Sequence, residues 1–283
     1  MSVTKIINQL IEHNIIPSKP EYKPLTGGTV SELYLIKNVD NSHYVIKINE
    51  TNIVKSEAEY LNYYKNISLI PNLIFVEPSY KYIVYSYIPG TTNYTLKSKK
   101  DLLITLVLEL INNYQTVTSK ENWGWADEPA ESWRDFLKSE ITRANTHIAP
   151  YLGSAEYDFV LNLIPESSTS THPYLLHGDC GMHNFIFDLA ELKGVIDPTP
   201  VLGRSYYDLI YAFCSSPVEL TVETIDSAML HLTTDDRGCF SYKDVLIVLY
   251  LRIAACIKHH PNDFDEYKRA WYYWKEILTR RKL

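Results

Sequence analysis

The sequence predicts an α+β protein of two lobes, a small N-terminal lobe rich in β-strands and a larger, mostly helical C-terminal lobe. Within the first ninety residues, short runs rich in Val, Ile and Tyr are bounded by turn residues, which is typical of strands. Beyond residue 98, apolar residues recur at three- and four-residue spacing, which is typical of amphipathic helices. We therefore expect lobes over residues 1–90 and 91–283.

The N-terminal lobe is expected to begin with an amphipathic helix, because Ile7, Leu10 and Ile11 are spaced as on one helical face. A second helix is expected in the stretch NIVKSEAEYLNYYK, which starts at Asn52. The runs VSELYLIK, HYVIKIN, LIFVE and YKYIVYSYI predict strands over residues 30–37, 43–49, 73–77 and 80–88.

The C-terminal lobe is expected to consist mainly of helices, the first of which has Ser98 as a suitable N-cap. The stretch LLHGDCGMHNFIFDLAELKGVIDP, residues 175–198, is expected to be the one β segment of this lobe. The helical spacing extends over residues 98–117, 130–150, 154–164, 205–216, 241–259 and 262–280.

Charge and cysteine content narrow the class of protein. The 283 residues carry a formal net charge of −7, whereas proteins that bind nucleic acid usually present a basic face, so we expect no nucleic-acid partner. The four cysteines are far apart and form no CxxC pair, which favours a reducing, cytoplasmic location. The N-terminal helix is unlike a signal peptide and the longest apolar runs are too short to span a bilayer, so we expect no membrane partner.

The stretch FIFDLAELKGVID predicts a β-hairpin around a polar turn that contains Gly194. Its midpoint falls between Ala190 and Glu191, and Asn184 and Asp197 are equidistant from that midpoint. We therefore expect these two side chains to face each other within reach of one cation. An amide oxygen and a carboxylate are ligands that suit Mg²⁺.

His177, Asp179 and Asn184 are arranged as His-x-Asp-x-x-x-x-Asn, the spacing of the catalytic loop of kinases. In that loop the Asp accepts the proton of the substrate hydroxyl and the Asn holds metal. The structural alternative is that Asp179 caps a turn and His177 is a buried histidine. Because the hairpin and Asp197 follow at the expected place, we favour the catalytic interpretation.

Lys47 is a candidate for binding phosphate. Strand alternation places Val45 and Lys47 on one face of their strand, so Val45 is a candidate for the nucleotide site as well. Glu57 shares an apolar stripe of the following helix with Ile53 and Leu61, so its carboxylate should point inward and need a partner. We expect Lys47 to be that partner, because a Lys–Glu pair orients the phosphate-binding lysine of kinases.

Gly27 and Gly28 lie between two strand-like runs, and Ser31 follows them. They could form a loop that covers phosphates, with Ser31 supplying a hydroxyl or an N–H group. A simple hairpin turn explains the two glycines equally well.

The motifs HGDCGMHN, VIDP and YYDL, behind a lobe that carries Lys47 and Glu57, resemble the aminoglycoside phosphotransferase and choline kinase-like family. The resemblance extends from about Thr26 to Phe213, and it implies a protein-kinase-like fold. It also implies phosphorylation of a small-molecule hydroxyl by ATP or GTP with Mg²⁺.

The resemblance further implies a role for several residues. Asp179 would be the base, Asn184 and Asp197 would bind Mg²⁺, and Glu57 would hold Lys47 on the nucleotide phosphates. The backbone of the stretch YSYI would meet the adenine, which makes Ser86, Tyr87 and Ile88 nucleotide-binding candidates. Asp208 would brace the catalytic loop, although Ser205 and Asp208 also fit a capping box.

Two departures from the family pattern leave the subfamily open. Pro198 and Thr199 follow the metal-binding Asp where many members carry Trp-Glu, and Arg204 stands where an acidic residue is frequent. Cys180 and His183 in the loop have no assigned role.

Two other functions are compatible with the motifs. A metal-dependent phosphohydrolase could use His177, Asp179 and His183 as ligands, but it leaves Lys47 and Glu57 unexplained. A non-catalytic, nucleotide-binding module is the other alternative, and we would expect such a chain to have lost the base or a metal ligand.

The acceptor is the least determined part of the reaction. Trp123, Trp125, Asp127 and Glu128 combine aromatic rings with carboxylates, which suits an amino sugar or another amine-bearing acceptor. An aromatic packing segment with solvated acids is the favoured alternative. The choice between ATP and GTP and the oligomeric state stay open.

Overall fold

The computed structural model describes residues 2–17, 20–25, 31–38, 42–92, 98–118, 122–166 and 172–281. The chain forms two compact units, one of residues 1–91 with 186–199 and one of residues 92–185 with 200–283. The prediction of lobes over residues 1–90 and 91–283 is therefore wrong for residues 186–199, which group with the N-terminal unit.

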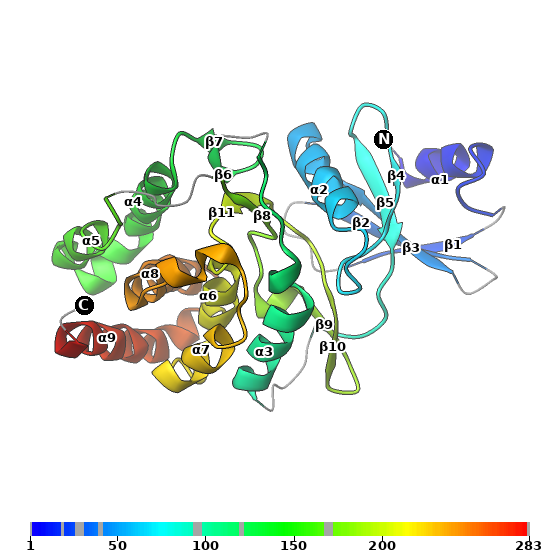
Figure 1. Ribbon diagram of the computed structural model, residues 1–283. Helices are drawn as coiled ribbons and strands as arrows, with labels where there is room; N and C mark the ends of the chain where they lie inside the picture. The colour runs from blue at the N-terminus through cyan, green and yellow to red at the C-terminus, as the bar shows by residue number, and fades with distance from the viewer. Residues whose placement is uncertain are drawn as a thin grey trace. The chain divides into compact units, whose positions relative to one another are not determined.

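The first unit is built on a five-stranded antiparallel sheet with strand order β1-β2-β3-β5-β4 (Figure 1). The strands are β1 (Glu21–Pro24), β2 (Glu32–Lys37), β3 (His43–Ile48), β4 (Leu73–Val76) and β5 (Tyr82–Ser86). The sequence predicts all of them except β1, whose four residues are exposed and show no apolar alternation.

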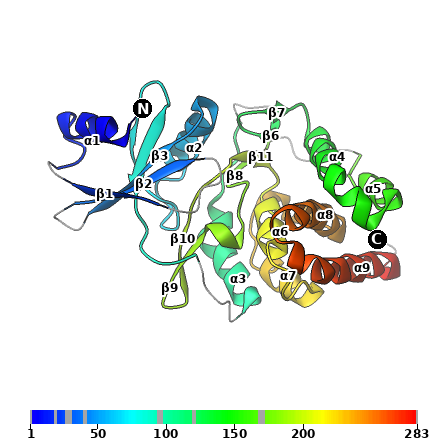
Figure 2. The same ribbon diagram turned by 180° about the vertical axis from the view of Figure 1, so that it is seen from behind.

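The two helices of the first unit cover opposite faces of this sheet, as Figures 1 and 2 show. On one face, α1 (Val3–Glu12) buries Ile6, Ile7 and Leu10 against Ile36 and Ile46 of the sheet. On the other face lies α2 (Thr51–Tyr63), which contacts β4 and β5. The side chains of β3 therefore divide between the two helices by strand alternation.

The predicted hairpin forms from β9 (Phe185–Asp188) and β10 (Glu191–Val195). Thr91 and Phe187 exchange two backbone hydrogen bonds of 2.9 Å, and Val195 N–H donates to the carbonyl of Leu69 at 2.8 Å. These bonds are the reason that residues 186–199 group with the first unit rather than with the helices.

The second unit is mainly helical, and 12 of the 18 residues of α8 (Tyr242–His259) are buried. It packs against α4 (Trp133–Leu152), α6 (Tyr207–Cys214) and α9 (Phe264–Arg281), as Figure 2 shows. The other helices are α3 (Lys99–Glu109), α5 (Ser154–Leu161) and α7 (Val222–Met229). The sequence predicts six of these seven helices and misses α7.

A four-stranded sheet of order β7-β6-β11-β8 lies in the second unit. Its strands are β6 (Trp123–Trp125), β7 (Pro129–Ala130), β8 (Tyr174–Leu176) and β11 (Val201–Gly203). The expectation of a single β element in this half is therefore wrong, because strands of two or three residues are too short to show a period.

None of the helices in the described ranges is long and apolar enough to cross a membrane.

Candidate active site

Lys47 lies between two carboxylates of the first unit. It is 2 % exposed on β3, and its Nζ is 2.5 Å from Oε2 of Glu57, which is 1 % exposed on α2. Nζ also donates a hydrogen bond to Oδ1 of Asp197. Burial alone would lower the pKa of Lys47, but the charges of Glu57 and Asp197 outweigh it and raise that pKa above its ordinary value. The lysine is therefore held as a cation.

This ion pair forms where the sequence predicts it. Val45 and Lys47 share the α2 face of β3, while Ile46 packs against α1 on the other face. The contact with Asp197 was not predicted, because strand and helix periods say nothing of a residue 150 positions away. The role of Val45, Lys47 and Glu57 in nucleotide binding stays a prediction.

Asp197 follows the hairpin in a left-handed backbone conformation, with φ 60°. Asp tolerates this conformation better than most residues. The turn consists of Leu189 and Ala190, both at positive φ, so Gly194 lies in β10 and the predicted midpoint is one position too late. Measured along the chain from this turn, Asn184 and residue 195 are equally distant, whereas Asp197 is two positions further away. The prediction that Asn184 and Asp197 are equidistant from the turn is therefore wrong.

The segment predicted to meet the adenine, residues 85–88, begins within the end of β5. Ser86 N–H donates to the carbonyl of Asn72, and Tyr87 N–H donates to the carbonyl of His43, each at 2.9 Å. Among the described residues, the N–H of Ile88 has no such partner. If the backbone of this segment binds the nucleotide base, Ile88 is thus the N–H donor available for it.

The predicted phosphate-covering loop is described only in part. Gly27 and Gly28 lie outside the described residues. Ser31 accepts a hydrogen bond of 2.7 Å from the side-chain amide of Asn49. Its hydroxyl is therefore engaged within the first unit, and its contact with phosphate stays a prediction.

The carboxylate of Asp179 is held at both oxygens within the second unit. Oδ1 accepts from the hydroxyl of Tyr211 at 2.8 Å, and Oδ2 accepts from Nδ2 of Asn184 at 3.0 Å. Nε2 of His183 lies 3.1 Å from Oδ2. Burial would raise the pKa of Asp179, but the contacts with His183 and Tyr211 outweigh it and hold that pKa well below its ordinary value.

The loop has room for His183 because residue 181 is a glycine. A Cβ atom at Gly181 would lie 2.6 Å from the imidazole ring of His183. His183 has a side chain that is 53 % exposed, so the ring lies at the surface of the second unit and touches the carboxylate with its inner edge.

Asp208 at the start of α6 fixes the beginning of this loop. It is fully buried, and it accepts from the backbone N–H groups of His177 at 2.8 Å and Gly178 at 3.0 Å. The hydroxyl of Tyr114 also donates to it, at 2.6 Å. Burial raises the pKa of Asp208 to about 6, against the effect of these three bonds. The side chain of Ser205 instead bonds to Asp236 and Thr234, so the capping-box alternative is not what forms.

His177 is fully buried. A side chain in that position suits a residue that supports the loop better than one that meets the substrate. Its predicted catalytic role stays untested.

Asn184 has the chemistry expected of a magnesium ligand. Its Nδ2 donates to the backbone carbonyl of Asp179 at 2.9 Å as well as to Oδ2. This leaves the carbonyl oxygen Oδ1 as the atom that could bind a cation. Asp197, in the first unit, likewise has one carboxylate oxygen beside the one that contacts Lys47. Each of these two residues thus offers an oxygen of the kind that a hard cation such as Mg²⁺ binds.

The aromatic acceptor candidates divide into a core residue and a surface group. Trp123 is buried, and its ring lies 6.1 Å from that of Trp133 and 5.6 Å from the guanidinium of Arg204. It therefore serves packing. Trp125 is half-buried and donates to Glu140 at 3.2 Å, while Asp127 and Glu128 are exposed. These last three stay acceptor candidates.

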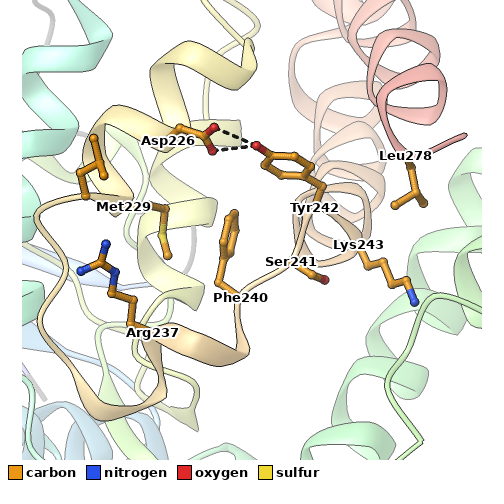
Figure 3. Close-up of a pocket in the computed structure, with 9 residues that line it drawn as sticks. Asp226, Met229, Arg237, Phe240, Ser241, Tyr242, Lys243 and Leu278 are labelled. Carbon is orange, nitrogen blue, oxygen red and sulfur yellow. Dashed lines mark hydrogen bonds between the residues drawn. The ribbon is translucent and has the colours of Figure 1, made fainter. Parts of the chain in front are cut away.

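A cavity of about 760 Å³ lies elsewhere in the second unit, between α7, the start of α8 and the end of α9 (Figure 3). Met229, Phe240 and Leu278 line it, and the hydroxyl of Tyr242 points at both oxygens of Asp226. Its lining includes no residue of the loop 177–184. It is thus not the place where an acceptor hydroxyl would meet Asp179.

Sequence reasoning missed Tyr211, which donates a hydrogen bond to Asp179, and Arg252, which donates one to Tyr211. Tyr211 follows Asp208 by three positions, so helical spacing could have placed it on the same face of α6. Arg252 lies on α8, 41 residues further on, and nothing in the sequence connects it to the loop.

A family of known proteins matches most of this chain in sequence. The model of the phosphotransferase enzyme family matches residues 21–227. None of the curated proteins matches the chain in sequence.

Solved structures of similar fold include choline kinase from Cryptosporidium parvum Iowa II, at 14% identity, with 99% of this chain and 97% of that chain covered and a TM-score of 0.62. Choline kinase LicA from Streptococcus pneumoniae is 18% identical, with 96% and 99% covered and a TM-score of 0.61. A thermostable mutant of aminoglycoside phosphotransferase APH(4)-Ia, in ternary complex with ADP and hygromycin B, is 16% identical, with 99% and 98% covered and a TM-score of 0.60. The expected protein-kinase-like α+β fold is confirmed.

Proposed function

The chain belongs to the phosphotransferase enzyme family, and from this membership we propose that it transfers the terminal phosphoryl group of ATP or GTP to a hydroxyl group of a small molecule. The reaction would use Mg²⁺, Lys47 and Asp179. The individual acceptor is to be identified by testing a panel of small molecules.

The observation that carries the proposal is Lys47, a buried cation between Glu57 and Asp197. A buried lysine with a helical Glu partner is the arrangement with which kinases hold nucleotide phosphates. Two carboxylates on one lysine also leave the second oxygen of Asp197 beside a fixed positive charge. A nucleotide phosphate would be attracted to the positive charge of Lys47, and Mg²⁺ would be attracted to the second oxygen of Asp197.

The second unit supplies the base. Asp179 is ionised at neutral pH, because its pKa is held low by His183 and Tyr211. A carboxylate of this kind accepts the proton of the acceptor hydroxyl as the hydroxyl oxygen attacks phosphorus. Lys47 would neutralise charge on the transferred group. When bound, Mg²⁺ on Asn184 and Asp197 would add a second positive charge there.

Amine-bearing acceptors are the first class to test. Two proteins of similar fold are choline kinases, and a third is an aminoglycoside phosphotransferase with hygromycin B bound. In this chain, Asp127 and Glu128 are exposed carboxylates two and three positions after Trp125 in the sequence. Carboxylates and an aromatic ring together attract an ammonium group.

The phosphohydrolase alternative lacks a ligand set. Within the described ranges, no three His, Cys, Asp or Glu side chains are grouped so that they could hold a metal ion. His177 is fully buried, whereas His183 is exposed at the surface. We therefore prefer phosphoryl transfer over hydrolysis.

The test is phosphoryl transfer from labelled ATP, and separately from GTP, with Mg²⁺. The acceptors are aminoglycosides, choline, ethanolamine, homoserine and simple sugars. Asp179→Asn serves as the blank, because it keeps the shape of the side chain and removes the base. We expect a labelled product with the wild type, and nucleotide binding without turnover in the variant. Full turnover of Asp179→Asn, or neither product nor nucleotide binding with the wild type, would contradict the proposal.

A further inference from the structure

One face of helix α6 contacts the catalytic loop at three points. Asp208, Tyr211 and Ser215 follow one another at spacings of three and four, which places them on one side of the helix. Asp208 holds the two backbone N–H groups at the start of the loop. The hydroxyl of Tyr211 donates to Oδ1 of Asp179, and Oγ of Ser215 accepts from Met182 N–H at 3.2 Å. Tyr211 is the one member of this row that contacts the carboxylate of Asp179.

Arg252 of α8 lies behind Tyr211. Its side chain is buried, NH1 donates to the hydroxyl of Tyr211 at 3.2 Å, and its guanidinium carbon lies 5.3 Å from the ring centroid. A guanidinium has only donors, so the oxygen of Tyr211 must be the acceptor in this bond. The single proton of that hydroxyl is then directed to Asp179. Arg252 thus fixes the direction of the hydrogen bond that Tyr211 makes.

The two oxygens of Asp179 differ in how far they are occupied. A carboxylate has about four lone-pair sites, two on each oxygen. Oδ2 is taken up by Asn184 and His183, at 3.0 and 3.1 Å. Oδ1 accepts, among the residues that the structure describes, only from the hydroxyl of Tyr211. The remaining site for an incoming hydroxyl is therefore on Oδ1, the oxygen that Tyr211 holds.

We propose that Tyr211 and Arg252 are positioning residues for phosphoryl transfer: Arg252 orients the hydroxyl of Tyr211, and Tyr211 fixes Oδ1 of Asp179 as the oxygen that accepts the proton. This inference rests on the proposed function. As the acceptor oxygen bonds to phosphorus, the bond from phosphorus to the nucleoside diphosphate breaks and the acceptor proton moves to Oδ1. Tyr211 keeps its own proton throughout.

The test compares Tyr211→Phe, Arg252→Met and the double variant in the full-length chain. The acceptor is whichever compound of the panel the wild type phosphorylates. We expect kcat to fall about 10- to 100-fold in each single variant, because Tyr211→Phe removes the hydrogen bond to the base and Arg252→Met removes the bond that directs it. KM for MgATP should stay within about twofold, since the nucleotide-binding candidates of the first unit are unchanged. The double variant should be no slower than either single one, because Arg252 is inferred to act on Asp179 through the hydroxyl of Tyr211.

Controls separate positioning from general stability. Tyr250 is a buried tyrosine of α8 whose hydroxyl donates to Asn145 at 3.0 Å rather than to a residue of the loop. Tyr250→Phe should therefore leave kcat unchanged. Arg252→Lys keeps a charged donor and should recover most of the turnover lost in Arg252→Met. If Arg252→Met fails to fold, Tyr211→Phe, which lacks a single oxygen, decides the question.

Two results would overturn the inference. One is a Tyr211→Phe variant with wild-type kcat in an active enzyme, and this result leaves the proposed function intact. The other is a double variant whose loss is the product of the single losses, which would show that the two residues act separately. A wild type that gives neither product nor nucleotide binding overturns the proposed function itself, and the positioning role falls with it.

Discussion

Lys47 and Glu57 form an ion pair of 2.5 Å between β3 and α2, and both side chains are almost completely buried. A buried charge is costly unless it is paired, so each residue depends on the other for its ionised form. Lys47 has two ionic partners, Glu57 and Asp197. Among the salt bridges of the described residues, Glu57 has one, which is Lys47. The pair is therefore asymmetric, and the two residues should respond differently to substitution.

We predict that Glu57→Gln weakens nucleotide binding while the chain still folds. Lys47 keeps its contact with Asp197, but it loses the carboxylate that fixes its position on the helix side. The affinity for MgATP should fall about 10-fold, the effect of one charge-assisted hydrogen bond. Calorimetric titration with MgATP measures this change. Glu59→Gln, on the exposed side of the same helix, is the matched control. Equal affinities of the two variants would contradict the prediction.

We predict that Asp208→Asn destabilises the second unit more than Tyr114→Phe does. In the wild type, the carboxylate of Asp208 accepts three hydrogen bonds, two from backbone N–H groups and one from a hydroxyl. The asparagine side chain has an NH₂ group in place of one of the two accepting oxygens. At least one buried donor then lacks an acceptor, which costs about 1 to 3 kcal/mol. Tyr114→Phe removes one bond and should cost about 1 kcal/mol. Denaturant unfolding gives both values, and an Asp208→Asn variant as stable as the wild type would refute the assignment.

The sequence was sufficient for contacts that depend on short periods. Alternation in β3 and the apolar stripe of α2 each set which way one side chain points, because burial enforces both periods. The contact of Lys47 with Glu57 follows from those two directions. The spacing of Asp179 and Asn184 within one loop is likewise local, and the two side chains do meet.

Sequence reasoning failed where geometry depends on a single dihedral angle or on distant segments. The hairpin turn uses Leu189 and Ala190 at positive φ, although residues other than Gly, Asn and Asp seldom adopt it, so no turn signal marked its position. The four strands of the second unit are too short for a period. Arg252 reaches Tyr211 only because α8 packs on α6. Tertiary packing determines that contact, and no local pattern encodes it.

We predict that Trp123→Leu lowers stability rather than changing the acceptor. The ring is buried against Trp133 and Arg204, so its loss leaves a cavity that costs about 2 to 4 kcal/mol. The exposed Asp127 is the matched control, and Asp127→Asn should change stability by less than about 0.5 kcal/mol. Urea unfolding of both variants measures the difference. A Trp123→Leu variant with wild-type stability would place the ring outside the core.

The carboxyl group of Asp244 should make the stability of the chain depend on pH. Near the start of α8, Oδ2 accepts from the backbone N–H of Ser241 at 2.8 Å and from its hydroxyl at 3.2 Å. Burial raises the pKa of Asp244 to about 6 from an ordinary value of 3.8, against the effect of these bonds. The folded chain thus holds this proton more tightly than the unfolded chain does. The stabilising contribution is complete below the ordinary pKa and is lost as pH rises through 6.

We therefore predict that the wild type loses stability relative to Asp244→Asn as pH rises from 4 to 7. The amide can accept both hydrogen bonds and cannot ionise, so the difference between the two unfolding free energies isolates this group. It should change by about 2 to 3 kcal/mol, with most of the change between pH 4 and 6. Ser241→Ala keeps the carboxyl group and removes one bond that favours its ionised form, so its pH dependence should be at least as large as that of the wild type. Urea unfolding at half-unit steps of pH measures all three chains, and a difference that does not vary with pH would show that Asp244 is ionised in the folded chain throughout this range.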